Sequence, residues 1–510
     1  MHLRVPAVIS RSRSRRHRLV AATVGGALLV AACSTTTDAG GDRGSAATSP
    51  ATTTASGPAG TAGSTAPAPP PLRWTTCQDA DEVECASLTV PLDHADPGGR
   101  TIDLAVARRA ARDPDERLGA LVSNPGGPGA SGVDYVQASA TFEGIGDRFD
   151  IVSWDPRGIG RSAPVRCEEQ AAPYQALDWS PDDAVERDAL DEGATAVAED
   201  CAADDVELLG HLSTEDTARD LDLLRAALGD EQLTYVGFSY GTLIGLRYAD
   251  LFPARVRAIV LDGVVDPTND LGAALEDQTR ALDQATREVF SACDRAASCP
   301  VSDAGATYDR LAAQVEERPI PAGGEVVGPT ALAYAVIGSA YSASASRNLL
   351  AGMAAAERGD GRQLARLADG YFSTSSYGSY LATVCVDSPH PTGSTPFTEL
   401  EDRLAEVSPR FGAAVANEVR PCAFWATPAT GSVDPVHAAG AAPILVVGNR
   451  GDFATPYDSA VRVADELDHG VLLTYDGQGH LSYGKSTCVD DAVNDYLTDL
   501  TLPDEGTTCS

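Results

Sequence analysis

The sequence predicts an α/β fold in which a mainly parallel sheet is completed after a large helical insertion. Short apolar, β-prone segments alternate with helical patterns as far as about residue 265, and two further apolar segments follow residue 440. Such alternation is typical of a parallel sheet that carries helices on both faces. Between residues 266 and 440 the chain is rich in alanine and shows no succession of strands. We therefore expect this part to form a helical lid.

The expected elements follow from the spacing of apolar residues and from the residues that end helices. Alternating or continuous apolar segments predict strands. The predicted strands are 86–92, 102–107, 119–123, 149–154, 233–238, 256–261, 443–448 and 471–475. The predicted helices are 214–228, which Gly229 is placed to end, 242–249 and 490–500. We expect the first two strands to form an antiparallel start to the sheet.

The most informative local pattern is a serine between two glycines at a predicted strand-to-helix turn. The pattern is Gly237-Phe238-Ser239-Tyr240-Gly241. Such a turn is a nucleophile elbow, which lifts the serine hydroxyl out of the backbone while the small neighbours prevent a clash. The amino terminus of the following helix favours developing negative charge. We therefore expect Ser239 to be a nucleophile and not part of an ordinary glycine-rich turn.

A nucleophilic serine requires a base, and an acid must orient that base. On a fold with a nucleophile elbow the chain order is serine, acid and histidine, each at the carboxyl end of a strand. His480 is the one histidine that follows the last predicted strand, in Gly-Gln-Gly-His. We therefore expect His480 to be the base.

The expected acid is Asp452, which follows the penultimate predicted strand in Gly-Asp-Phe-Ala-Thr-Pro. Thr455 is placed to hydrogen-bond to the aspartate or to its loop. Asp262, directly after strand 256–261, is the alternative acid. If Asp452 merely formed an Asx-turn, its replacement by alanine would leave turnover intact.

A glycine- and proline-rich turn at 124–129 (Asn-Pro-Gly-Gly-Pro-Gly) follows strand 119–123. In folds with a nucleophile elbow, this position supplies a second donor to the oxyanion. We expect the N–H groups of Gly127 and Tyr240 to hold the oxyanion, with Gly126 as a further candidate donor. The turn at 155–162 receives a structural role only, in which Arg157 ties loops together.

The amino-terminal segment is typical of an export signal. Six arginines, five of them between residues 11 and 18, precede an apolar stretch at 19–32 that is too short for a comfortable membrane span. The stretch ends in Val-Ala-Ala-Cys33, which resembles a bacterial lipobox, so we expect Cys33 to be acylated. The alternative is ordinary signal cleavage near the alanines, with Cys33 incidental.

These observations divide the chain into five parts. The part at 33–72 is rich in Thr, Ala, Ser, Gly and Pro and is expected to be disordered. The predicted parts are a lipoprotein signal peptide at 1–32, a disordered tether at 33–72, the first part of the core at 73–265, the helical lid at 266–440 and the second part of the core, with acid and histidine, at 441–510.

The cysteine count favours an oxidising compartment, because ten cysteines, an even number, remain when Cys33 is set aside. Sequence alone leaves their connectivity open, and the simplest pairing joins neighbours. That pairing is Cys77 with Cys85, Cys167 with Cys201, Cys293 with Cys299, Cys385 with Cys422, and Cys488 with Cys509. A zinc site is the competing interpretation, but the chain contains no C-x-x-C pair. We expect no metal and no cofactor.

The composition argues against nucleic-acid binding and against anionic membrane surfaces. The 38 lysines and arginines are far outnumbered by the 73 aspartates and glutamates, which gives a formal net charge of −35. Lys485 is the only lysine, so a Ser-Lys dyad has almost no candidates. We expect a monomer that meets a membrane only through its amino-terminal lipid.

As a set, these motifs resemble the exported tripeptidyl aminopeptidases of actinobacteria, which are serine exopeptidases related to proline iminopeptidases. The similar segments are 124–129, 155–162, 237–242, 451–456 and 479–488. The resemblance covers about residues 74–509. It implies an α/β-hydrolase fold with a large helical lid. It also implies that Ser239 is the nucleophile, Asp452 the acid and His480 the base.

The resemblance further implies substrates that are peptides with free N-termini, cleaved near that end. Such an enzyme must bind an ammonium group, so an acidic side chain should project from the lid. Asp387, close to Cys385, is the candidate. The alternative role for Asp387 is that of a surface aspartate that caps a turn.

Three functional hypotheses remain open from the sequence. The first is an exopeptidase that releases short peptides, with tripeptides as the expected products, through an acyl-enzyme. It would be secreted or anchored at the extracellular face of the membrane. The second is a carboxylesterase or lipase of the cell envelope that uses the same triad. The third is a non-catalytic lipoprotein that binds peptides on an inherited hydrolase fold.

Overall fold

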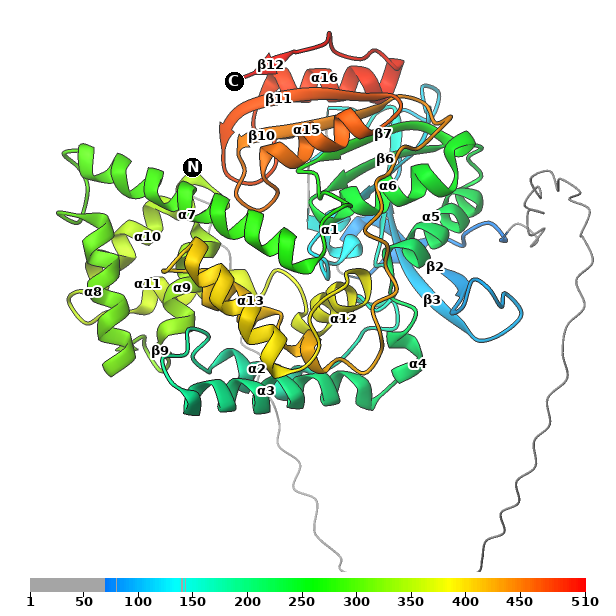
Figure 1. Ribbon diagram of the computed structural model, residues 1–510. Helices are drawn as coiled ribbons and strands as arrows, with labels where there is room; N and C mark the ends of the chain where they lie inside the picture. Colours follow the sequence, from blue (N-terminus) through cyan, green and yellow to red (C-terminus); the bar gives the residue numbers. More distant parts are fainter. Residues whose placement is uncertain (1–68, 79, 139–140, 143) are drawn as a thin grey trace, which may run out of the picture. The chain divides into compact units, whose positions relative to one another are not determined.

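The computed structural model describes residues 69–78, 80–138, 141–142 and 144–510 (Figure 1). The predicted signal peptide, Cys33 and most of the predicted tether lie outside the described residues. Within the described part, no helix is long and apolar enough to cross a membrane.

A ten-stranded sheet is the centre of the fold, in the order β1-β2-β3-β5-β4-β6-β7-β10-β11-β12. The strands are β1 (Thr75–Cys77), β2 (Ala80–Pro91), β3 (Thr101–Arg109), β4 (Gly119–Asn124), β5 (Phe149–Trp154), β6 (Leu233–Phe238), β7 (Val256–Asp262), β10 (Ile444–Gly451), β11 (Gly470–Gln478) and β12 (Thr508–Cys509). β1, β2 and β3 are antiparallel, and the seven strands from β5 to β12 in this order pair in parallel. The predicted mainly parallel sheet with an antiparallel start is therefore confirmed.

Alternate residues of the central strands supply two apolar layers. Val236 and Phe238 of β6 pack in one cluster with Val493 of α16 (Thr487–Asp499). Tyr235 packs in the other cluster, with Leu221 of α5 (Thr214–Leu228) and with residues of α6 (Tyr240–Leu251) and α15 (Tyr457–Glu466). Because successive side chains of a strand point to opposite faces, helices on both faces bury both sets.

The chain between β7 and β10 is almost wholly helical, as its alanine-rich composition predicts (Figure 1). Its helices are α7 (Leu271–Arg295), α8 (Ala304–Glu317), α9 (Pro329–Ser339), α10 (Ala343–Ala356), α11 (Arg362–Phe372), α12 (Tyr377–Asp387), α13 (Ser394–Val407), α14 (Gly412–Glu418) and the 3-10 helix η2 (Arg420–Phe424). A short hairpin of β8 (Ile320–Pro321) and β9 (Val326–Val327) interrupts them. We call this segment the insertion.

An earlier part of the chain also packs against the insertion. The remaining helices are α1 (Gly132–Ala138), α2 (Glu168–Gln175), α3 (Ala184–Ala203) and α4 (Val206–Leu209). Tyr174 of α2 donates a hydrogen bond to the carbonyl of Asn417, and Arg420 forms an ion pair with Asp191 of α3 at 2.7 Å. The periodicity of the sequence did not predict these contacts, because the partners of the two helices lie more than 200 residues further along the chain.

Five disulfides stabilise the fold, and each joins the two cysteines that the neighbour pairing matched. Cys77–Cys85 links β1 to β2, Cys167–Cys201 links α2 to α3, and Cys293–Cys299 closes the end of α7. Cys385–Cys422 links α12 to η2, and Cys488–Cys509 links α16 to β12. Cross-links of this number fit an oxidising compartment.

Arg157 has the structural role that the sequence predicts. Its guanidinium donates to both carboxylate oxygens of Asp220 at 2.8 Å and to the carbonyls of Leu92 and His211. Both charged side chains are fully buried. Burial disfavours the charged carboxylate, but the charge of Arg157 and the hydrogen bonds from His94 and Arg157 together outweigh this effect and hold the pKa of Asp220 below its usual range.

We predict that Arg157→Met destabilises the protein by about 3–5 kcal/mol, because it leaves the Asp220 carboxylate buried without its counter-charge. The measurement is urea unfolding of both proteins at neutral pH. The matched control is Arg100→Met, since Arg100 forms its ion pairs with Asp205 and Glu207 at the surface. An exposed pair contributes about 1 kcal/mol or less. Equal losses in the two variants would contradict the structural role of Arg157.

Candidate active site

Ser239 lies at a strained turn between β6 and α6, as the elbow motif predicts. Its backbone has φ 53° and ψ −124°, a region that residues with side chains rarely adopt. A side chain on Gly237 would place its Cβ 2.3 Å from the carbonyl oxygen of Gly241, so only glycine fits there. The Ser239 amide donates to the carbonyl of Asp262 at 3.0 Å, which ties the turn to β7.

Asp452 and His480 form a buried pair at the ends of β10 and β11. Nδ1 of His480 lies 2.9 Å from both carboxylate oxygens of Asp452. The aspartate also accepts hydrogen bonds from the amides of Ala454, Thr455 and Leu481, at 3.0–3.1 Å. These donors fix the carboxylate, and the carboxylate fixes the ring so that Nε2 points away from it.

The charge state of Asp452 follows from these contacts. Burial by itself would raise its pKa, but the interaction with His480 and the backbone donors outweigh burial and lower it. Thr455 adds a further hydrogen bond, from its hydroxyl to the carboxylate at 3.1 Å. Asp452 is therefore held as an anion beside the imidazole.

Asp262, the alternative acid, has a different role in the structure. One of its carboxylate oxygens accepts hydrogen bonds from the amides of Ser482 and Tyr483, at 3.0 and 2.8 Å. Burial, together with the nearby charge of Asp452, raises the pKa of Asp262 to about 6. The side chain thus holds the chain just after His480, while the imidazole bonds to Asp452.

Two contacts connect the serine turn with the histidine loop. The Ser239 amide bonds to Asp262, and the next residue, Gly263, approaches the imidazole so closely that a Cβ there would lie 3.2 Å from Cε1 of His480. On the other side of the loop, Lys485 donates to the carbonyl oxygen of His480. These contacts place the Ser239 turn and the Asp452–His480 pair at the same edge of the sheet.

The glycine-rich turn after β4 packs directly on the elbow. A Cβ on Gly126 would lie 2.5 Å from the carbonyl oxygen of Phe238 and 3.2 Å from the amide nitrogen of Tyr240. The Gly126 amide donates to the side chain of Asn124 at 2.9 Å and is thereby occupied. Tyr240 begins α6, so its amide has no acceptor within the helix. Of the predicted donors, Gly126 is therefore occupied, whereas the Tyr240 amide has no partner within the helix.

A pocket opens at this edge of the sheet. Its lining includes Gly127, Ser239 and Tyr240 from the core, and Tyr380 and Asp387 from the insertion. Apolar side chains supply much of the rest, with Leu243, Val264, Leu271 and Leu275 among them. The pocket thus offers a nucleophile, backbone donors and an apolar wall to a ligand.

Asp387 lines this pocket, but its carboxylate is engaged. It accepts hydrogen bonds from the amide of Thr214, at 2.5 Å, and from the hydroxyl of the same residue. Thr214 is the first residue of α5, and its hydroxyl also bonds to the phenol of Tyr240 at 2.6 Å. Burial raises the pKa of Asp387 to about 6. Asp387 thus caps the amino terminus of α5, but it lines the pocket and is not the surface aspartate of the alternative.

Sequence reasoning missed a group of aromatic residues on the insertion. The ring of Tyr341 packs edge-on against the imidazole of His480, at 5.6 Å between centroids, and against Phe453 at 5.0 Å. Three further tyrosines, Tyr371, Tyr377 and Tyr380, lie within one stretch of ten residues of the insertion. That density of tyrosine was the available signal, but helical periodicity alone does not show which of them face the site.

Comparisons with known proteins agree with this geometry. Residues 408–509 match the family model described as TAP-like protein. The chain is 33% identical over 477 residues to serine protease Hip1 of Mycobacterium tuberculosis, covering 86% of this chain and 91% of that protein. It is 34% identical over 491 residues to carboxylesterase B of the same organism, covering 88% and 92%. It is 32% identical over 443 residues to tripeptidyl aminopeptidase of Streptomyces lividans, covering 81% of each.

These matches extend over most of each chain, and the family model spans the predicted acid loop and histidine loop. The chain therefore belongs to the tripeptidyl aminopeptidase-like family of α/β-hydrolases.

Proposed function

We propose that the protein is an exported serine peptidase that releases short peptides from the free N-termini of its substrates, with tripeptides as the expected products. The observation that carries this proposal is the buried Asp452–His480 pair beside a serine on a strained elbow, within a family whose members include a serine protease and a tripeptidyl aminopeptidase. The non-catalytic hypothesis is disfavoured, because a binding protein needs neither the pair nor the strain.

The proposed reaction begins with attack by the Ser239 hydroxyl on the scissile carbonyl. Nε2 of His480 accepts the hydroxyl proton, and Asp452 stabilises the imidazolium that results. The N–H groups of Gly127 and Tyr240 hold the oxyanion of the tetrahedral intermediate. His480 then donates the proton to the leaving amine, the C–N bond breaks, and an acyl-enzyme remains on Ser239.

Water completes the proposed cycle. His480 takes a proton from the water as it attacks the acyl carbonyl, and the same donors hold the second oxyanion. The proton returns to Ser239 when the ester bond breaks. The released product is the N-terminal segment of the substrate with a free carboxylate.

A carboxylesterase is the second candidate, and the relative named carboxylesterase B favours it. The triad and the oxyanion donors serve amides and esters alike, so they do not distinguish the two. The peptidase is the first candidate because two of the relatives are named serine protease and tripeptidyl aminopeptidase.

The proposed location is outside the cytoplasmic membrane. Five disulfides and the absence of any membrane-spanning helix among the described residues fit an exported domain. Acylation of Cys33, with residues 34–72 as a tether to a monomeric enzyme, would hold that domain at the cell surface.

We predict that Ser239→Ala lowers turnover at least about 10⁴-fold, since the elbow segment 237–241 contains no other serine or threonine. A serine-reactive phosphonate should label the wild-type protein at Ser239, as located by mass spectrometry, and leave the variant unlabelled. Unchanged turnover in the variant, or labelling of a different serine, would remove Ser239 from its proposed role.

We predict that Asp452→Asn lowers kcat/KM about 10³–10⁴-fold, because an amide cannot hold the imidazole in the required tautomer. The matched control is Asp262→Asn, which retains an oxygen to accept from Ser482 and Tyr483 and should cost less than about tenfold. The reverse order of the two effects would make Asp262 the acid.

Asp262→Asn has a second readout in stability. Burial raises the pKa of Asp262 from 3.8 to about 6, so the folded protein binds this proton more tightly than the unfolded chain does. The free energy of unfolding should therefore fall as pH rises from about 4 to about 6. Urea unfolding across this range should show a smaller fall in the variant, and an identical pH profile would contradict the shifted pKa.

A further inference from the structure

Glu418, at the end of α14, places a carboxylate among the tyrosines of the insertion. It accepts a hydrogen bond from the hydroxyl of Tyr371 at 2.9 Å, and its side chain is buried, with 8% of the residue exposed. The hydroxyl of Tyr377 donates to the main-chain carbonyl of Glu418. The rings of Tyr334 and Tyr371 lie 5.0 Å apart. Burial raises the pKa of this carboxyl to about 7.

None of the ion pairs among the described residues includes Glu418. No cationic side chain of this part of the chain therefore balances the carboxylate. Arg420, two residues away, is committed elsewhere: it bonds to Asp191 at 2.7 Å and to Glu401 at 3.1 Å. A buried carboxylate without a counter-charge is costly, and a protein that keeps one commonly uses it. A cationic ligand would supply the missing charge.

The carboxylate lies close to the proposed catalytic residues. Tyr371, which bonds to Glu418, packs 6.3 Å from the ring of Tyr341, and Tyr341 packs on His480. On the other side, the charge of Glu418 contributes to raising the pKa of Tyr380, which lines the pocket of Ser239. Both routes from Glu418 thus reach the triad through one or two aromatic rings.

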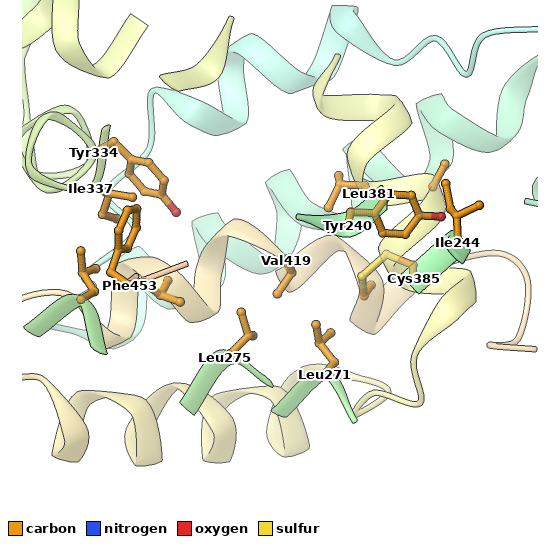
Figure 2. Packing of buried hydrophobic residues seen from close by; sticks show 14 of the residues in the cluster. Tyr240, Ile244, Leu271, Leu275, Tyr334, Ile337, Leu381, Cys385, Val419 and Phe453 are labelled. Carbon is orange, nitrogen blue, oxygen red and sulfur yellow. A yellow bond between two sulfur atoms is a disulfide. The ribbon is translucent and has the colours of Figure 1, made fainter. Parts of the chain in front are cut away.

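Figure 2 shows the same relation in the packing of the insertion. Val419, the neighbour of Glu418, lies in this view between Tyr334 and Phe453 on one side and Tyr240 and Leu381 on the other. Phe453 follows the proposed acid, and Tyr240 follows the proposed nucleophile. In this view Val419 therefore lies between a neighbour of the proposed acid and a neighbour of the proposed nucleophile.

We propose that Glu418, together with the tyrosines around it, binds the free α-ammonium group of the peptide substrate. This proposal rests on the proposed exopeptidase function and identifies the residue that selects for a free N-terminus. A charge-assisted hydrogen bond to the carboxylate and the faces of nearby phenol rings are the two interactions that recognise an ammonium group in a partly buried site.

Glu418 fits this role better than Asp387 does. Both carboxylate oxygens of Asp387 accept hydrogen bonds from Thr214, and the side chain thereby caps α5. An ammonium at Asp387 would have to compete with these bonds. The Glu418 carboxylate instead accepts a hydrogen bond from the hydroxyl of Tyr371, which orients it.

The site would also set the length of the released peptide. If the ammonium group is held at Glu418 and the scissile carbonyl at Ser239, the number of residues between them is set by the fold. The released peptides would then have one length, which the relative named tripeptidyl aminopeptidase suggests is three residues.

The test compares a tripeptide anilide that carries a free amine with the same substrate after N-acetylation. The readout is the ratio of their kcat/KM values in the wild type and in Glu418→Gln, which keeps the shape and the acceptor for Tyr371. We expect the wild type to prefer the free amine and the variant to lose about 10- to 100-fold of that preference. A merely structural role for Glu418 would lower kcat/KM for both substrates alike and leave the ratio unchanged.

Two variants serve as controls. Glu399→Gln removes one exposed charge from the insertion and should leave the ratio at its wild-type value. Asp387→Asn tests the other carboxylate, and loss of the preference in this variant with its retention in Glu418→Gln would overturn the proposal in favour of Asp387. If Glu418→Gln does not fold, Glu418→Asp keeps the charge but withdraws it by one methylene, and a ratio equal to that of the wild type would overturn the proposal.

The outcomes separate the two proposals. A wild-type preference for the free amine that survives in Glu418→Gln overturns the ammonium site and leaves the exopeptidase function standing. Equal turnover of free and acetylated peptides by the wild type overturns both. Ester hydrolysis without peptide hydrolysis would favour the carboxylesterase and would likewise overturn both.

Discussion

The parallel pairing of β6, β7, β10 and β11 is the constraint on which the rest of the site depends. Neighbouring parallel strands end at the same edge of a sheet, so the residues that follow them meet there although they are distant in sequence. Ser239, Asp262, Asp452 and His480 all stand at these ends. Asp452 and Asp262 then divide the work: one orients the imidazole, and the other holds the loop that carries it.

The insertion contains buried charged side chains, and they differ in whether a charge of opposite sign lies beside them. Arg420 is fully buried and is satisfied by Asp191, Glu401 and Asn417, and this network fixes the start of η2. Beside it, Glu418 has phenols for partners but no cation among the described residues. The contrast between two neighbouring buried charges, one neutralised and one not, is what distinguishes a structural residue from a candidate binding residue.

Much of the fold was predictable because apolar periodicity and glycine placement are local signals. Strands 233–238, 149–154 and 256–261 were predicted within one residue of their bounds, and so was the helix at 214–228. The short β12 was missed, since two residues carry no periodicity. The packing of α3 against η2 was also missed, because contacts across more than 200 residues leave no local pattern.

The sequence by itself determined the fold class and the candidates for nucleophile, acid and base, because the residue types and their order along the chain restrict which serine, acid and histidine can meet on a parallel sheet. It determined the pairing of cysteines only as the simplest choice. Tertiary structure alone decided that Asp387 caps a helix, that Tyr341 packs on His480 and that Glu418 lies unneutralised among tyrosines. Those facts depend on how helices of the insertion face one another, and helical periodicity shows which side of a helix is buried but not what it is buried against.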